Sequence, residues 1–558
     1  MFITQQLDLD EPARLCQFSG ILQPPAEAVL SRHTETELKL AVAPEYLAAI
    51  ADSAVVVARR SGEPVAALLD STYFDTTERA LSARRAVLRV RLTPDGYVQT
   101  LKRGDGLTRH EWEWPVAGPG FDLALITEPE ALATIAGLDA AALVPTIRTR
   151  FERSAHSLDQ GAIELAIDAG EIIGPDGKRE PISEIELELK SGEPASLYRL
   201  AQALSETVPL RLETRSKAAR GFALADGEPP RPFKSQRLVF DATTTVDSAL
   251  AAILGGCFHQ FSLNEPCVLA GDDPEGVHQA RVALRRLRSA LSLFRDLLPA
   301  ADRQWLAEET KALAGILGPA RDWDVFLTEL LAPVKAAFAV HPELYADLAA
   351  LETAALARRR QAYDDVRALF ESPGQTRFRL RFGEWLESRG WRAQPVTRSS
   401  ALLFRPLRET ADTLLDRRHR KARKTGGGFT ELGYDDRHQL RIAMKKLRYA
   451  TDFFRSLYDE KPVGRYLLRL STFQDALGQL NDVATAARLA HQLDSLPDGA
   501  AARAVGMVIG WHSRGLAALE PRLVAEWQEF RTAKLFWSRP GRDQSTLAVG
   551  VDGAHRVR

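Results

Sequence analysis

The chain has 558 residues, of which 45% are hydrophobic and 26% charged, and its formal net charge is −1 at pH 7. One hydrophobic core rarely serves so long a chain, so we expect two to four domains. No apolar run approaches the roughly 18 residues of a membrane span, and the first residues lack a secretion signal. The three cysteines have neither metal-ligand spacing nor a disulfide framework. These features predict a cytoplasmic protein without a membrane partner.

Residues 1–32 show no convincing period, and we expect a loosely ordered extension there. From 33 to 226 the pattern changes to short alternating runs separated by Gly, Pro and Asp, which is typical of strands. Charged residues recur at every second position of these runs, so they share one side of each strand. The charged positions, in chain order, are Glu35, Glu37, Lys39, Arg89, Arg91, Lys102, Arg109, Glu111, Glu113, Arg148, Arg150, Asp168, Glu184, Glu186 and Glu188.

The repeated charged face favours a closed barrel with a charged lumen. Three glutamates on one side of a strand repel one another unless a cation neutralises them. A solvated outer face explains any single strand, but it does not explain acid-rich and base-rich strands in one set. A barrel whose lumen is charged and whose outer face is covered satisfies the whole pattern. In such a lumen carboxylates can hold a hard divalent cation, while arginines and lysines can clamp phosphate oxygens.

These strands resemble the CYTH family, the triphosphate tunnel metalloenzymes. The resemblance covers about residues 33–226 and rests on the order of several short motifs. They are Glu35-Thr36-Glu37-Leu38-Lys39, Tyr73-Phe74-Asp75-Thr76, Leu88-Arg89-Val90-Arg91, Thr100-Leu101-Lys102, Glu184-Ile185-Glu186-Leu187-Glu188 and Ser216-Lys217 with Arg220-Gly221. The family implies an eight-stranded antiparallel barrel that hydrolyses a triphosphate with Mg²⁺ or Mn²⁺. A phosphoenzyme is not expected, because no Ser, Cys or His is well placed for covalent catalysis.

The resemblance also implies roles for individual residues. The implied phosphate clamps are Lys39, Arg89, Arg91, Lys102, Arg148, Arg150 and Lys217. The implied metal ligands are Glu35, Glu37, Asp168, Glu184 and Glu186, together with Glu188. Glu111 and Glu113 are expected in or near the lumen, where they can orient the clamps or hold a second metal. Tyr73 and Phe74 are expected in the core or at the rim.

A proline-rich segment, 227–242, separates the strands from a second region, 243–538, rich in Ala, Leu, Arg and Glu, which is typical of helices. Asp273-Pro274 predicts the start of one helix, with Asp273 as its N-cap. The basic run 417–424 precedes Gly426-Gly427-Gly428, where we expect a helix to break. Residues 539–558 are expected to form a polar tail.

One segment of the helical region occurs twice. His278-Gln279-Ala280-Arg281-Val282-Ala283-Leu284-Arg285-Arg286-Leu287-Arg288 is echoed by His438-Gln439-Leu440-Arg441-Ile442-Ala443-Met444-Lys445-Lys446-Leu447-Arg448, and 438 minus 278 gives an offset of 160. Leu317-Gly318 and Asp322 recur as Leu477-Gly478 and Asp482 at the same offset. Two copies of a helical unit are therefore expected, each with one His and several cations on one face. Such paired faces indicate a polyanionic partner.

This repeat resembles the conserved histidine α-helical domain, CHAD, over roughly residues 243–538. The family implies two repeated four-helix units and binding of inorganic polyphosphate. The implied contacts are His278, Arg281, Arg285, Arg288, His438, Arg441, Lys445 and Arg448. A nucleic-acid partner is ranked low, because no stacking aromatics interleave the basic helices.

Together these patterns predict an α+β multidomain protein. Its N-terminal part is expected to be an eight-stranded antiparallel β-barrel tunnel with flanking helices, and its C-terminal part an all-α domain. The predicted function is metal-dependent hydrolysis of inorganic triphosphate coupled to polyphosphate binding, with an association with polyphosphate granules. Two alternatives stay open. The tunnel could act on thiamine triphosphate or a nucleoside triphosphate, or cyclise adenylate; or both parts could form a non-catalytic scaffold that binds polyphosphate.

Overall fold

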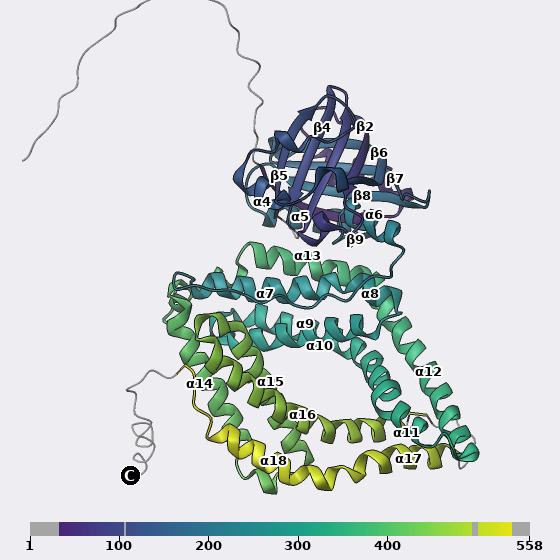
Figure 1. Cartoon of the computed structure of the whole chain (residues 1–558). Coiled ribbons are helices and arrows are strands. Elements are labelled where there is room, and N and C mark those ends of the chain that lie inside the picture. Colours follow the sequence, from purple (N-terminus) through teal and green to yellow (C-terminus); the bar gives the residue numbers. More distant parts are fainter. Residues whose placement is uncertain (1–32, 105–107, 491, 494–499, 538–558) are drawn as a thin grey trace, which may run out of the picture.

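A computed structural model describes residues 33–104, 108–490, 492–493 and 500–537, and it divides into a barrel and a helical half (Figure 1). The predicted N-terminal extension and C-terminal tail lie outside the described residues. Between the two halves, residues 227–245 contain no helix or strand. This connecting segment is nevertheless held in place by hydrogen bonds. The side chain of Asn264 accepts from the N–H of Phe233 and donates to its carbonyl, and Phe240 N–H donates to Ser456 Oγ at 2.9 Å.

Eight antiparallel strands close the predicted barrel, in the order β5-β4-β3-β2-β6-β7-β8-β1 and back to β5. A short ninth strand, β9, pairs with the end of β1. The strands are β1 His33–Val42, β2 Val65–Asp75, β3 Ala86–Thr93, β4 Gly96–Arg103, β5 Thr108–Val116, β6 Val144–Leu158, β7 Ile163–Ile173, β8 Arg179–Leu189 and β9 Leu210–Leu212. Closure removes exposed strand edges and leaves one face of every strand in a shared interior.

Apolar and charged residues alternate along β1 and β8 because the two faces of these strands have different surroundings. Leu38 and Leu40 on β1 and Ile185 and Leu187 on β8 point outward, and α5, Ala195–Ser205, buries them. The opposite side of the barrel is covered in the same way by short helices, which bury Leu88, Leu101 and Trp112 of β3, β4 and β5. These helices are α3 Ala80–Ala83 and α4 Pro129–Ile135, whereas α1 Leu47–Ala51 and α2 Ala54–Val57 pack on the same side of the barrel as α5. Since the apolar residues face the covering helices, the charged ones face inward.

Helix α6, Lys217–Asp226, covers one end of the lumen. The hydroxyl of Ser216 caps it by accepting from the N–H of Ala219. Gly221 allows the close approach, because a Cβ there would lie 2.1 Å from Ile147 Cδ1. Ala218 and Phe222 pack with Tyr73 and Ile147, residues of the barrel wall. The first residue of α6, Lys217, is thereby directed into the lumen.

The helical half repeats its elements at the offset seen in the sequence. Helix α9, Pro274–Leu293, corresponds to α15, Tyr434–Phe454, and each is followed by a 3₁₀ turn, Arg295–Leu297 and Arg455–Leu457. Asp273 caps α9 as predicted, accepting from the N–H of Glu275. The other elements of this half are α7 Val246–Leu263, α8 Glu265–Ala270, α10 Ala300–Val325, a π-helical turn Phe326–Leu331, α11 Ala332–Ala337, α12 Pro342–Glu371, α13 Pro373–Glu387, α14 Leu407–Thr425, α16 Glu460–Ala490, α17 Ala500–Arg514 and α18 Leu516–Arg531.

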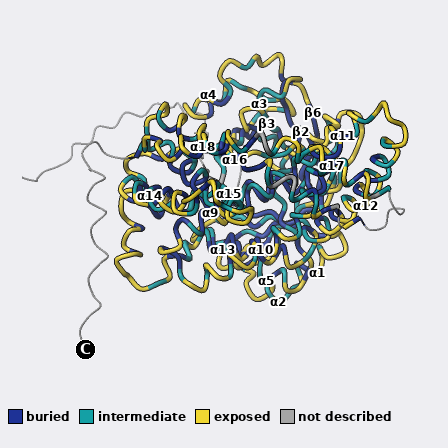
Figure 2. The backbone as a smooth tube through the Cα atoms, turned by 90° about the horizontal axis from the view of Figure 1, so that it is seen from below, coloured by how far each residue is buried: buried dark blue, intermediate teal, exposed yellow. Residues whose placement is uncertain are grey.

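The two halves meet where α13 packs against α5 and β9 (Figure 1). Gly383 packs closely against Tyr198, because a Cβ added at Gly383 would lie only 2.1 Å from the tyrosine ring. Gln202 Nε2 donates to Glu384 Oε2 at 2.7 Å, and Thr376 Oγ1 donates to the Leu210 carbonyl at 2.8 Å. Figure 2 shows the buried positions gathered in the interior of the molecule and the exposed ones on its outer turns. The helical half is thus docked on the barrel through specific contacts.

Candidate active site and basic helices

Strands β1 and β8 carry carboxylates and a lysine along the inner face of the barrel. Their antiparallel register places Lys39 opposite Glu186 and Glu37 opposite Glu188. Lys39 Nζ lies 2.5 Å from Glu37 Oε1 and 2.8 Å from Glu186 Oε1. Burial alone would lower the pKa of Lys39, but Glu186 and Glu37 outweigh it and raise that pKa. Lys39 therefore stays charged and joins the two strands.

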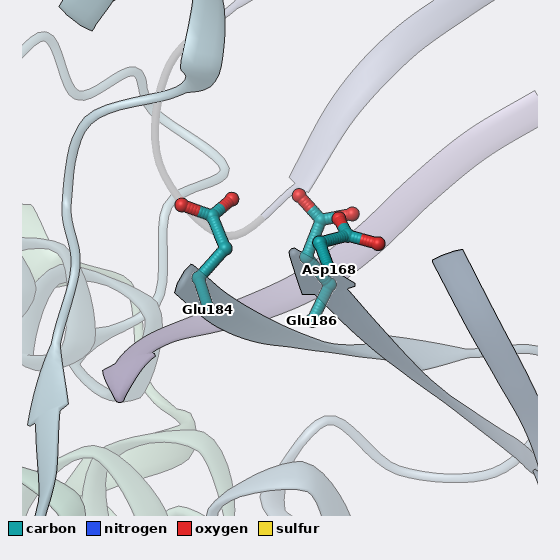
Figure 3. A group of neighbouring side chains, drawn as sticks. All are labelled: Asp168, Glu184 and Glu186. Atoms are coloured by element: carbon teal, nitrogen blue, oxygen red, sulfur yellow. The ribbon is translucent and has the colours of Figure 1, made fainter. Parts of the chain in front are cut away.

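Asp168 on β7 forms an acidic group with Glu184 and Glu186 on β8 (Figure 3). One carboxylate oxygen of each residue lies within 4.8 Å of those of the other two. The carboxylates rise from the same face of the two strands, and Asp168 and Glu184 are only 0% and 1% exposed. Three oxygen donors at this spacing fit a hard divalent cation such as Mg²⁺ or Mn²⁺.

The ammonium group of Lys217 lies in the middle of this acidic group. Its Nζ is 2.7 Å from Asp168 Oδ2, 2.5 Å from Glu184 Oε1 and 3.0 Å from Glu186 Oε1. Burial would lower the pKa of Lys217, but the three carboxylates raise it above its usual value. Because α6 carries Lys217, the helix that covers the lumen is electrostatically bound to the candidate metal ligands.

Arg153 of β6 is the second cation on this group. Its Nε and Nη2 donate to the two oxygens of Asp168 at 2.8 and 2.7 Å, and Nη2 also donates to Glu186 at 2.5 Å. Burial would raise the pKa of Glu186, yet Lys217, Lys39 and Arg153 hold that pKa well below its usual range. The neutralisation required for same-face glutamates is thus provided by buried cations.

The base-rich wall is formed by β3, β4 and β5. Lys102 Nζ lies 2.6 Å from Glu35 Oε2 and 3.1 Å from Glu111 Oε2, and Arg89 Nη2 lies 3.4 Å from Glu111 Oε1. Glu111 therefore contacts two of the predicted clamps. The charged inner faces of β1 and β5 are joined by these pairs.

Arg91 differs from its neighbours in lacking an acidic partner. Its Nε donates to Ser71 Oγ at 3.1 Å, and no carboxylate of the described ranges lies within ion-pair distance. Burial and the nearby Arg89 lower the pKa of Arg91 to about 10. The same two arginines lower the pKa of Tyr73, although burial alone would raise it. An anion placed here would relieve this crowding of positive charge.

The prediction that Arg148 and Arg150 lie in the lumen is wrong. Both are exposed on the outer face of β6, where Arg148, with a side chain 52% exposed, pairs with Asp70. The inner positions at this end of β6 are Ile147 and Thr149. They are uncharged because α6 packs against this part of the wall. Where a helix packs against the inside of the barrel, the inner face of the strand is uncharged and the charged face of that strand lies outside.

The structure adds three lumen cations to those predicted. Arg153 occupies an inner position further along β6, Arg109 Nη1 lies 2.9 Å from Glu37 Oε1, and Arg220 binds Glu180 and Glu184, each at 2.7 Å. Arg109 is one of the alternating charged positions of the sequence and Arg220 belongs to the last of its motifs, but neither was predicted as a site residue. Arg153 lies two residues after the buried Phe151, on the same side of β6, so the apolar side of this strand is the signal in the sequence that indicates it.

Two predicted acids lie apart from the acidic group. Glu188 pairs with Lys190 at 2.7 Å, and burial raises its pKa. Glu113 has a side chain 46% exposed and accepts from Thr100 Oγ1 at 3.0 Å. Glu35 and Glu37, also predicted as ligands, are held by Lys102 and Lys39. The carboxylates that the structure brings together as a cation site are thus a subset of those predicted.

The repeated basic helices, α9 and α15, lie against each other in the helical half. Arg285 Nε donates to Tyr449 Oη at 3.5 Å, which links the basic face of α9 to α15. Arg288 is exposed, and the other predicted polyphosphate contacts are half-buried: His278, Arg281, Arg285, His438, Arg441, Lys445 and Arg448. Nδ1 of His278, Nε and Nη1 of Arg281 and Nε of Arg448 are buried without a hydrogen-bond partner among the described residues.

Protonation of His278 is disfavoured by its surroundings. Burial, together with the positive charge of Arg321 and the weaker effects of Arg285 and Arg281, lowers its pKa to about 4, although Glu275 acts in the opposite direction. A neutral ring at physiological pH offers one donor and one acceptor. At physiological pH His278 is therefore a neutral polar side chain rather than an additional cation.

Comparison with known proteins identifies both halves. A family model for the CYTH domain matches residues 33–222, and one for the CHAD domain matches residues 252–491. The chain carries a CYTH domain followed by a CHAD domain.

Among curated proteins, the chain is similar to the inorganic triphosphatase of Haemophilus influenzae. The two are 30% identical over 210 residues, which cover 34% of this chain and 54% of that protein. The chain thus spans about half the length of this relative.

Two solved structures illustrate the similarity of each half. The CHAD domain from the plant Ricinus communis is 32% identical and has a TM-score of 0.46, covering 55% of this chain and 98% of that one. A protein from Hippeastrum, described as a putative adenylyl cyclase with a dominant triphosphatase activity, is 20% identical and has a TM-score of 0.26. That match covers 34% of this chain and 96% of the Hippeastrum chain.

Among the described residues, no helix is both long and apolar enough to cross a membrane.

Proposed function

We propose that the CYTH domain hydrolyses inorganic triphosphate with the help of a divalent cation. The observation that carries this proposal is the carboxylate group of Asp168, Glu184 and Glu186 facing the same lumen as Arg89, Arg91 and Lys102. Pure anion binding needs no carboxylates, whereas oxygen ligands suit Mg²⁺ or Mn²⁺. The similarity to a triphosphatase supports the same assignment.

The lumen side chains would exchange partners when a triphosphate binds. In the structure Lys39, Arg89 and Lys102 are paired with carboxylates. These three cationic side chains would then bind the oxygens of the triphosphate. Glu111 would keep Arg89 and Lys102 oriented toward the phosphate oxygens. Asp168, Glu184 and Glu186 would hold the divalent cation, which when bound would help to neutralise charge on the terminal phosphoryl group. Water would then attack that group in line with the leaving oxygen, while the arginines stabilise the transferred charge.

The test is a phosphate-release panel on the full chain with tripolyphosphate, longer polyphosphates, thiamine triphosphate and nucleoside triphosphates. Tripolyphosphate should be turned over fastest, and EDTA should stop the reaction. A preference for thiamine triphosphate or a nucleotide would transfer the assignment to that substrate, and formation of cyclic AMP would indicate a cyclase. No turnover of any compound with Mg²⁺ or Mn²⁺ present would favour the non-catalytic scaffold.

For the CHAD domain we propose binding of inorganic polyphosphate by the basic faces of α9 and α15. The support is the duplicated set of cations, in which Nε and Nη1 of Arg281 and Nε of Arg448 are buried without a hydrogen-bond partner among the described residues. Such an interaction should weaken steeply as salt rises, because bound cations displace counterions from the polyanion. It would bring the enzyme to polyphosphate stores such as granules.

The double variant Arg281→Glu with Arg441→Glu should lose polyphosphate binding in the full chain. Its triphosphatase activity should be retained, because both substitutions lie in the helical half. Equal polyphosphate affinity of this variant and the unmodified protein at physiological salt would contradict the assignment.

A further inference from the structure

The two halves of the CHAD repeat differ in charge at one equivalent place. On the central helices the offset is 160, so Arg286 corresponds to Lys446 and Ser292 to Asp452. On the helices that pack beside them, α7 and α14, the starts Val246 and Leu407 give an offset of 161. Cys257 on α7 therefore corresponds to Arg418 on α14, which lies in the basic run of the sequence.

In the first arrangement a carboxylate lies among the cations. Asp452 on α15 faces Arg448, Arg286 and Arg455, which counteract the rise in its pKa caused by burial. Arg286 also lies over the ring of Phe453, at 5.3 Å from its centroid, and beside the neutral thiol of Cys257. This copy thus has one carboxylate beside its cations.

In the second arrangement the carboxylate is missing and a cation is added. Ser292 stands where the other copy has Asp452, and Arg418 Nη2 donates to its hydroxyl at 3.0 Å. Lys446 has Arg418, Arg288 and Lys421 as its charged neighbours, and burial together with their repulsion lowers its pKa.

The acids nearest in sequence to this cluster already have partners, since Asp416 accepts from Trp537 Nε1 at 2.7 Å. Asp296 pairs with Arg417 and Arg295. Within the part of the chain that the structure describes, no carboxylate lies at ion-pair distance from Arg288, Arg418, Lys421 or Lys446. The Nε atom of Arg418 is buried without a hydrogen-bond partner. The cations of one copy therefore have no acidic residue in the position that Asp452 occupies beside the cations of the other copy.

We propose that Arg418, Lys446 and Arg288, with the Ser292 hydroxyl, form a binding site for a phosphoryl group. A phosphate oxyanion would occupy the role that the Asp452 carboxylate has in the other copy, accepting charge-assisted hydrogen bonds from guanidinium and ammonium groups. Arg288 and Lys421 are exposed, so they leave the cluster open to solvent, while Arg418 and Lys446 are half-buried and form its inner part.

The position of Arg288 connects this site to the predicted polyphosphate contacts. Arg288 shares a helical face with Arg281 and Arg285, because residues three, four and seven apart lie on one side of a helix. A polyphosphate chain on α9 could therefore extend one unit onto the cluster. This extension rests on the proposed polyphosphate binding, whereas binding of free orthophosphate does not.

The decisive variant restores the missing carboxylate. Ser292→Asp copies Asp452 into the second arrangement, and Ser292→Asn is its uncharged control. Isothermal titration of the full chain with orthophosphate should detect one fewer site in Ser292→Asp, or an affinity at that site reduced roughly tenfold, as for lost charge-assisted hydrogen bonds. The Asn control should keep the site. Thermal unfolding without phosphate should show Ser292→Asp to be more stable, because the internal carboxylate relieves cation repulsion.

A second variant, Arg418→Cys, introduces the residue of the other copy and should also remove the orthophosphate site. Loss of orthophosphate together with weaker binding of long-chain polyphosphate would identify the site as part of the polyphosphate track. Loss of orthophosphate with unchanged polyphosphate affinity would identify a separate phosphate site. Unchanged orthophosphate binding in both Ser292→Asp and Arg418→Cys, each folded as judged by its melting transition, would overturn the proposal.

Discussion

The guanidinium group of Arg281 on α9 lies directly against Gly318 on α10. A Cβ at Gly318 would be 2.9 Å from Arg281 Nη1, so the absence of a side chain there makes room for the arginine. The second copy repeats the arrangement more loosely, since a Cβ at Gly478 would lie 3.6 Å from Arg441 Nη2. The Leu-Gly pair that recurs in the sequence is therefore coupled to the recurring arginine.

This difference predicts unequal effects of two alanine substitutions. Gly318→Ala should weaken polyphosphate binding, because the added methyl group displaces the guanidinium of Arg281. Gly478→Ala should bind normally, since its methyl group makes an ordinary van der Waals contact. Both variants should gain about 0.5–1 kcal/mol of helix stability, so a loss of binding cannot be ascribed to unfolding. Fluorescence titration with polyphosphate would measure the effect, and equal affinities of the two variants would contradict it.

Arg89→Ala should raise KM and lower kcat for tripolyphosphate, because a clamp acts on both the ground state and the transition state. Arg89→Lys should restore activity only partly, since lysine lacks the bidentate fork. The matched control is Arg148→Ala, which removes an arginine from the outer face and should leave the kinetics unchanged. Normal kinetics for Arg89→Ala, or a loss in Arg148→Ala as large as in Arg89→Ala, would show that the lumen has been assigned to the wrong side of the strands.

Glu186→Gln should abolish turnover and also lower the melting temperature. Glu186 contacts Lys39, Arg153 and Lys217, so its neutralisation leaves buried cations without a partner. Breaking a buried pair on one side typically costs about 3–5 kcal/mol. Glu113→Gln is the comparison, because that side chain is 46% exposed and should affect stability little. A Glu186→Gln protein as stable as the unmodified one would argue against the ion pairs described.

Lys217→Met should strengthen binding of a divalent cation, because the ammonium group occupies the centre of the three carboxylates. Titration with Mn²⁺, followed by electron paramagnetic resonance, should give an affinity at least about tenfold higher, corresponding to roughly 1.4 kcal/mol. The ligand-free variant should melt at a lower temperature, since Asp168, Glu184 and Glu186 lose a buried partner. Lys190→Met, which removes the partner of Glu188, should leave the Mn²⁺ affinity unchanged. Weaker Mn²⁺ binding in Lys217→Met would show that the lysine helps to form the cation site.

The stability of the helical half should fall in mildly acidic solution because of His419. This residue is buried among Tyr466, Phe530 and Trp537, and burial, assisted by Arg423, lowers its pKa to about 4. An unfolded histidine has a pKa of about 6.5, so between these values the unfolded chain binds more protons. The neutral ring of His419 contributes its full share to the free energy of unfolding above pH 6.5, and this share is lost as the pH falls toward 4. The loss at pH 5 is about 2 kcal/mol.

His419→Gln should therefore show a smaller drop in melting temperature between about pH 7.5 and pH 5 than the unmodified protein. His341→Gln, at an exposed histidine, serves as the control and should retain the full drop. Direct titration by NMR of the His419 ring provides a second measurement. A ring that titrates near its usual pKa would contradict the burial effect.

The sequence by itself determined the two domains, the alternation of the barrel strands and the repeat of the helices. Periodicity sufficed for these features because apolar faces must be buried and the period of a strand or helix fixes which residues share a face. The same rule located Lys39, Glu186 and Arg89 on inner faces. It also identified the face of α9 that carries Arg281.

Only the tertiary structure decided which side of β6 is the inner one. The sequence favoured Arg148 and Arg150 because they alternate with uncharged residues, but the inner side of a strand is set by what packs against it. Here α6, distant in sequence, fills that end of the barrel and makes the uncharged side the inner one.

The sequence alone likewise could not predict which charged side chains form ion pairs with one another. Lys217 and Asp168 are 49 residues apart, yet their charged groups meet at 2.7 Å because α6 returns to the end of the barrel. The internal carboxylate of one CHAD copy, Asp452, and its replacement by Ser292 in the other became meaningful only once the neighbouring helices were placed. Local pattern fixes the face of an element, but the contacts between faces arise from how the whole chain packs.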